Sequence, residues 1–155
     1  MHEVNVASAS ADGDGAADED VVTHFLAGVA AGDTDAVIDT MAADAELVTP
    51  LSNRVVVRGR DDLRVFFTAF LPVLSKELQW GARVGGGKTT VALAVARIGG
   101  VRVQDAMLIE QDEDGRIRRL TPHIRPWLGL TVSALVLGPK LIRHPGLIRR
   151  AMSRR

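Results

Sequence analysis

Two side chains in the second half of the chain have the chemistry to carry a proton, Asp105 and His123. Segment 101–126 predicts two strands joined by an acidic turn that ends in Gly115. Side chains alternate across a strand, so Asp105 shares one face of the first strand with four apolar residues, Val101, Val103, Met107 and Ile109. A carboxylate on such a core-facing surface is expected to have a raised pKa, which suits general acid/base work near neutral pH.

The second strand of this pair is expected to bring an imidazole to the same region. Alternation groups four of its residues on one face, Ile117, Arg119, Thr121 and His123. The unperturbed pKa of histidine lies near neutrality, so His123 could exchange protons with Asp105. Structural roles remain open for both: Asp105 could be satisfied by Arg102, Trp80 or backbone amides, and His123 by a backbone carbonyl at a rim.

Composition narrows the classes of function. The chain has 155 residues, 46% of them hydrophobic and 25% charged, which fits one soluble domain with a real core. It has no cysteine, so disulfides, thiolate nucleophiles and cysteine-bound zinc are excluded, and we expect a cytoplasmic protein without a secretory signal. The four histidines and the acids show no metal-ligand spacing. We therefore expect no metal, no cofactor and no nucleic-acid partner.

A phosphate-loop interpretation of Gly87-Lys88-Thr89 fails on two counts. The pattern needs a glycine five positions before Gly87, where the chain has Ala82. It also needs a helix afterwards, whereas the segment TVALAVARI is typical of a strand. A β-hairpin is the better interpretation.

The first half of the chain predicts helices. Residues 1–17 are acidic and have little to bury, so we expect disorder there. A helix over 18–31 has an apolar stripe and ends at Gly32, and Asp33 caps a second helix with Val37, Ile38 and Met41 inward. Short strands are expected at 45–50 and 53–58. The helix after Gly59 has a wide apolar face, formed by Leu63, Phe66, Phe67, Phe70, Leu71 and Leu74.

The second half predicts an antiparallel meander, so the fold class is α+β. The strand near 78–84 alternates with Leu78, Trp80, Ala82 and Val84 on one face, and glycine turns at 85–88 and 99–100 reverse the chain. Strand 89–97 has large residues on one face and alanines on the other. That pattern favours a sheet covered on both sides.

The C-terminal segment 127–155 predicts an apolar and then basic helical extension. Residues 127–138 carry no charge but are too few to span a bilayer. Residues 140–155 mix apolar and basic side chains, and no acidic residue occurs after Asp114. This tail could pack on the protein, lie on an anionic membrane surface or project into solvent. We favour packing.

Several short segments in this order resemble one known family. They are 25–33 (FLAGVAAGD), 41–46 (MAADAE), 49–50 (TP), 59–67 (GRDDLRVFF) and 114–117 (DGRI). Together they resemble the nuclear transport factor 2-like superfamily, and within it the SnoaL-like and ketosteroid-isomerase-like branch. The resemblance covers residues 18–126. It implies a cone in which a curved antiparallel sheet wraps around N-terminal helices, with an apolar cavity and frequent dimers.

The resemblance carries over only part of the known active sites. Ketosteroid isomerases have a carboxylate base where this chain has Thr49, and an oxyanion tyrosine where it has Phe25. Their second oxyanion donor, a protonated aspartic acid, aligns with Asp105. Limonene-epoxide-hydrolase-like relatives need an aspartate where this chain has Gln104. SnoaL-like cyclases pair an acid/base aspartate with histidines, which Asp105 and His123 resemble.

The sequence therefore predicts a cofactor-independent enzyme of isomerase, cyclase or lyase type, acting as a homodimer on a hydrophobic carbonyl compound. Asp105 and His123 are the predicted catalytic residues. The predicted pocket residues are Phe25, Trp80, Phe66, Phe70, Met107, Thr49 and Thr121. The alternative is a non-catalytic ligand-binding or protein-interaction module of the same fold, with a basic tail at 140–155 for a membrane surface.

Overall fold

The structure is a computed structural model that describes residues 16–50, 52 and 54–153. The expected disorder of residues 1–17 lies outside this range, apart from the last two residues, which are helical. The first half runs α1 (Ala16–Ala31), α2 (Thr34–Asp39), β1 (Met41–Val48), β2 (Val56–Arg58) and α3 (Arg60–Leu74). A 3-10 turn (Ser75–Glu77) then leads to β3 (Gln79–Gly86), β4 (Thr89–Ile98), β5 (Val101–Gln111), β6 (Ile117–Thr121), β7 (Ile124–Arg125), α4 (Trp127–Leu141) and α5 (Pro145–Met152).

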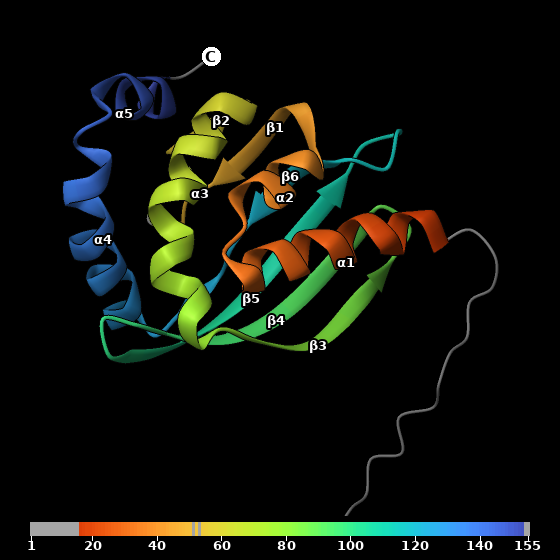
Figure 1. The fold of residues 1–155 in the computed structure, drawn as a ribbon, viewed down its shortest axis with the longest axis horizontal. Coiled ribbons are helices and arrows are strands. Elements are labelled where there is room, and N and C mark those ends of the chain that lie inside the picture. The colour runs from red at the N-terminus through yellow and green to blue at the C-terminus, as the bar shows by residue number, and fades with distance from the viewer. Residues whose placement is uncertain (1–15, 51, 53, 154–155) are drawn as a thin grey trace, which may run out of the picture.

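The strands form one curved sheet in the order β2-β1-β6-β5-β4-β3, and β7 pairs with β5. All pairs are antiparallel except β1 with β6. In Figure 1, α1 lies across β3 to β5, and α3 stands beside α4. The α+β cone that the sequence predicts is confirmed.

The predicted apolar stripes of α1 and α3 form the centre of the core. Phe25 and Val29 from α1 and Leu63, Phe67 and Leu71 from α3 are all buried. They meet the inner face of β1, β5 and β6, where Leu47, Ile109 and Leu120 are also buried. Burial of a side chain of this size contributes about 1.5–3 kcal/mol, so these contacts fix how the helices sit on the sheet.

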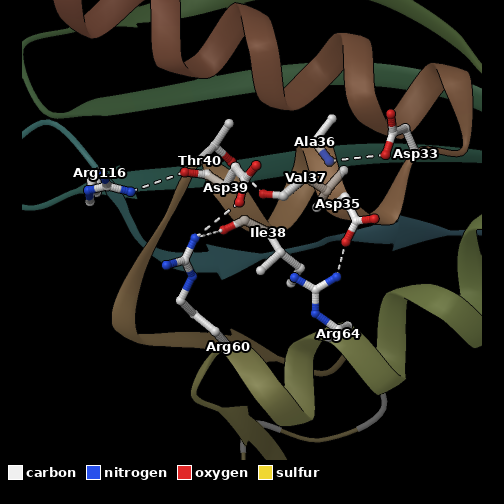
Figure 2. Close-up of polar contacts among 10 residues, drawn as sticks. All are labelled: Asp33, Asp35, Ala36, Val37, Ile38, Asp39, Thr40, Arg60, Arg64 and Arg116. Carbon is white, nitrogen blue, oxygen red and sulfur yellow. Dashed lines mark hydrogen bonds and ion pairs between the residues drawn. The ribbon is translucent and has the colours of Figure 1, made fainter.

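The short helix α2 is fixed by arginines from other elements (Figure 2). Arg60 of α3 donates to the Ile38 carbonyl at 2.8 Å, and Arg116 donates to the Asp39 carbonyl at 3.1 Å. These carbonyls belong to the last turn of the helix, where no intrahelical donor remains. The chain then enters β1 directly, so Met41, which the sequence placed in a helix, is a buried strand residue.

The two faces of β4 have different surroundings. Ala92, Ala94 and Ala96 are buried on the inner face, whereas Leu93 on the outer face is exposed. The prediction that both faces are covered is therefore wrong for the single chain, because the alanines face the helices and the larger residues face out. The predicted homodimer stays a prediction.

A bulge in β3 changes the face of Val84. The register shifts between Trp80 and Arg83, so Arg83 lies opposite the inward Ala92 and Val84 opposite Val91. Val84 is 68% exposed, although alternation placed it with Trp80. One extra residue reverses the faces of every side chain that follows.

The C-terminal extension packs on the cone. Gly129 of α4 lies so close to Val103 that a Cβ there would be 2.4 Å from Val103 Cγ1. In α5, Leu147 and Ala151 are buried, and Arg150 pairs with Asp62 of α3 at 2.5 Å. Of the three arrangements that the sequence left open, α5 therefore adopts packing on the protein. None of the helices in the described part of the chain is long and apolar enough to cross a membrane.

Candidate active site

A cavity of about 380 Å³ lies between the inner face of the sheet and the helices α3, α4 and α5. This volume falls within the usual range for small-molecule sites. Its lining combines aromatic residues from α1 and α3, alanines from β4, and aliphatic residues from the extension, among them Leu130, Leu137, Leu141 and Leu147. An apolar ligand would exchange water contacts for these side chains, and burial of its surface would favour binding.

Asp105 is the only ionisable side chain among the described residues that line this cavity. It lies on β5 between the inward-facing Val103 and Met107, as strand alternation predicts. Burial raises the pKa of the Asp105 carboxyl to about 6, because an apolar environment disfavours the charged form. The N–H of His123, the charge of its imidazole and the N–H of Ala106 oppose this rise in pKa.

His123 meets Asp105 through its backbone. β5 pairs first with β6 and then with β7, and the residues between those strands bring the His123 N–H to 2.8 Å from Asp105 Oδ1. The ring Nδ1 lies 3.1 Å from the Ala106 carbonyl, and the side chain is exposed. Of the structural roles that the sequence left open, these contacts match a carboxylate bonded to a backbone amide and a rim histidine bonded to a carbonyl.

The predicted common face of Ile117, Arg119, Thr121 and His123 does not exist. A register shift in β6 places Arg119 opposite Glu110 and Ile117 opposite Gln111, so the residues no longer alternate. Ile117 is buried, and so are Leu120 and its partner Ile109 on β5. The next pair along the strands is Thr121 with Leu108, which lies on the opposite face. Thr121 consequently points away from the cavity and is not among its lining residues.

The other six predicted pocket residues all line the cavity: Phe25, Thr49, Phe66, Phe70, Trp80 and Met107. Trp80 does not bond to Asp105, because its Nε1 donates to the Leu26 carbonyl at 2.9 Å. The Thr49 hydroxyl makes a long bond of 3.3 Å to the Ser52 carbonyl. Thr49 is therefore the most loosely held polar side chain of the wall.

The sequence interpretation missed the part of the lining that α5 supplies. Leu147, Ile148, Ala151 and Met152 all border the cavity. Their spacing is that of one helix face, which was the available signal, but a helix face does not reveal what it packs against.

His24 is exposed and borders a different hollow, beside α2. Within the described residues, no three histidine or acidic side chains gather in a way that could hold a metal ion.

The geometry defines a class first: an α+β cone with an apolar cavity and, in the described part of its wall, one ionisable residue. A family model described as a SnoaL-like domain matches residues 22–120, and the chain belongs to that family. No curated protein matches the chain at a significant level.

Solved structures similar to this chain have the same fold. One is an uncharacterised bacterial protein with a cystatin-like fold from Silicibacter pomeroyi, with a TM-score of 0.77, 19% identity, and coverage of 84% of this chain and 93% of that one. A steroid delta-isomerase from Pseudomonas aeruginosa has a TM-score of 0.75 at 20% identity, with 84% and 96% covered. An epoxide hydrolase/cyclase-like enzyme of pyran ring formation in the polyether salinomycin has a TM-score of 0.61 at 19% identity, with 72% and 93% covered.

Proposed function

We propose that this protein is a cofactor-independent enzyme that performs acid/base chemistry on a hydrophobic carbonyl compound bound in the cavity. The observation that carries the proposal is the position of Asp105, the single ionisable side chain among the described residues of an apolar wall. A carboxyl with a pKa of about 6 is mostly ionised at pH 7. It can therefore accept a proton from the substrate and return it without a large free-energy cost in either direction.

In the proposed reaction, the Asp105 carboxylate removes a proton from the carbon beside the carbonyl group. The C–H bond breaks, its electron pair forms the enolate, and the proton stays on Asp105. Exchange of the carboxyl proton with solvent, followed by return to the same carbon, gives an exchanged product. In a β,γ-unsaturated ketone the electron pair extends to the γ-carbon, and protonation there gives an isomerised product. We assign Thr49 to the carbonyl oxygen, because its hydroxyl is held only by the long bond to Ser52.

His123 is a positioning residue in this proposal. Its backbone N–H holds Asp105 Oδ1, while its ring is engaged near the Ala106 carbonyl and is exposed. The backbone contact keeps one carboxylate oxygen fixed and so orients the carboxylate in the cavity wall. The group that holds Asp105 is thus the backbone N–H of residue 123. The proposed reaction therefore depends little on which side chain stands at that position.

Hydrogen exchange into a simple apolar ketone tests the proposal. The protein would be incubated with 2-decalone in deuterium oxide, and deuterium beside the carbonyl would be followed by mass spectrometry. Asp105→Asn is expected to lower the exchange rate by roughly a hundredfold to ten-thousandfold, the usual contribution of a general acid or base. Binding of 2-decalone, measured by calorimetry, is expected to persist. Equal exchange by the variant and the wild type would refute the proposal.

His123→Ala is the matched control, because it removes the ring and keeps the backbone N–H. We expect an effect on exchange far below the roughly hundredfold loss that removal of a general base causes. A loss comparable with that of Asp105→Asn would instead assign the proton transfer to the imidazole.

The second candidate function is non-catalytic binding of an apolar ligand. It is favoured by the same wall, in which the described residues offer one ionisable group, and His123 is not among the residues that line the cavity. Binding of 2-decalone by the wild type without any deuterium incorporation would favour this function over catalysis.

A further inference from the structure

The outer side of α4 carries apolar side chains that the fold does not use. The inner side of this helix already packs, with Gly129, Ser133 and Leu137 buried. On the opposite side, Leu128 is 50% exposed, and Leu135 and Ile142 are each 70% exposed. These three residues, the outer stripe, follow one another at intervals of seven positions, which is close to two helical turns. They therefore lie on one face, with Ile142 as the C-cap of α4.

The outer stripe is part of a wider concentration of exposed apolar side chains. Among the described residues, seven large hydrophobic side chains are exposed, and five of them lie in the extension: Trp127, Leu128, Leu135, Ile142 and Met152. A soluble protein rarely gathers such residues on one element without a partner for them. Trp127 is 71% exposed at the first residue of α4.

The extension that carries the outer stripe has only positive charges of its own. The sequence has no acidic residue after Asp114, and Arg125, Arg143 and Arg149 are exposed at the two ends of the extension. Arg150 is also exposed but is engaged with Asp62 of α3. A second copy of this chain would bring the same positive face against itself, so like charges would oppose that pairing. The complementary occupant is therefore anionic and apolar at once.

We propose that the outer stripe of α4 docks on an anionic membrane surface. Leu128, Leu135 and Ile142 would enter the boundary between headgroups and acyl chains, and Trp127 would lie at the headgroup level, where tryptophan is enriched. Arg143 and Arg149 would contact anionic lipid headgroups. The expected cytoplasmic location would bring the chain to the leaflet that carries such lipids.

This docking would give α4 two roles. Its inner side lines the cavity through Leu130 and Leu137, and its outer side would lie in the bilayer interface. One helix would then separate an apolar cavity from a reservoir of apolar molecules. The docking goes beyond the proposed acid/base function and does not depend on it, because no residue of the outer stripe touches Asp105.

Vesicle flotation with the full chain tests the docking. The wild type is expected to float with vesicles of equimolar phosphatidylglycerol and phosphatidylcholine, more weakly as salt is added, and not with phosphatidylcholine alone. Leu135→Asp is expected to lower the partition coefficient by at least about tenfold. Arg143→Gln with Arg149→Gln is expected to lower it by roughly 25-fold, at about fivefold for each basic residue.

Val84→Asp is the matched control, because Val84 is similarly exposed but lies on β3. It should float like the wild type, and thermal unfolding would confirm that all variants fold. Quenching of tryptophan emission by brominated phosphatidylglycerol should be strong in the wild type and weak in Trp127→Phe. The proposal is overturned by no flotation of the wild type, by equal binding to neutral vesicles, or by unchanged binding of Leu135→Asp. It is also overturned if Leu135→Asp only abolishes self-association in solution.

Discussion

The cavity has two walls of different origin, and they carry different properties. The wall formed by the cone holds Asp105, and with it the only ionisable group that the described lining contains. The wall formed by α4 and α5 is apolar toward the cavity, and α4 is also apolar toward solvent at Leu135 and Ile142. The ionisable group therefore belongs to the SnoaL-like domain, whereas the extension lines the cavity on one side and is apolar toward solvent on the other. A change in one wall should therefore leave the properties of the other intact.

The largest effect on stability is expected at Asp105. The folded protein binds this proton more tightly than the unfolded chain, since the pKa is about 6 instead of the ordinary 3.8. The free energy of unfolding of the wild type therefore falls as the pH rises from about 4 to 6, and stays lower above that window. Asp105→Asn has no charge to bury, and its side-chain oxygen can still accept the His123 N–H.

We expect Asp105→Asn to be more stable than the wild type by about 2 kcal/mol at pH 7, with the gain fading toward pH 4. Urea unfolding over this pH range measures the difference directly. A variant that is both more stable and inactive would show that the cone wall sacrifices stability for reactivity. Equal stability of the two proteins at pH 7 would mean that the carboxylate is not held in an apolar environment.

A smaller effect is expected where the extension meets the cone. Gly129→Ala would place a methyl group against the buried Val103, at a position only 2.4 Å from its Cγ1. We expect a net destabilisation of about 1–2 kcal/mol, because overpacking outweighs the gain in helix propensity. Calorimetry should show weaker 2-decalone binding, while the pKa of Asp105 stays near 6.

Gly138→Ala is the control for that change and has the smallest expected effect. It lies in the same helix, but apart from its chain neighbours no residue would lie within 4 Å of a Cβ there. We expect a change in stability of less than about 1 kcal/mol, because the gain in helix propensity is opposed by contact of the new Cβ with the ring of Pro139. If both alanine variants lost stability equally, close packing at Gly129 would not be what fixes α4 on the cone.

Strand alternation predicted the Asp105 wall because β5 pairs with β4 without a break from Val101 to Glu110. Inward and outward positions then follow from sequence alone, and Val103 and Ile109 are buried as expected. The sequence also predicted the tight turn at Gly99 and Gly100, where both φ angles are positive.

The same rule failed in β3 and β6 for one physical reason. Each contains a register shift, and a single extra residue sends Val84 and Thr121 to the outer face. Whether a strand bulges depends on its partner strand, which sequence periodicity does not reveal. The position of α5 could not be predicted for a similar reason. Its apolar face indicates that Leu147 is buried, but not that Leu147 lines a cavity.

The pKa of Asp105 is the quantity on which the proposed function depends most directly. The side-chain carboxyl carbon can be followed by carbon-13 NMR from pH 3 to 9, with Asp105→Asn to assign its signal. Our mechanism predicts a midpoint near 6, because the cavity wall disfavours the charged form. A midpoint at or below 3.8 would show a solvated or strongly paired carboxylate, and would contradict a proton carrier that works near neutral pH.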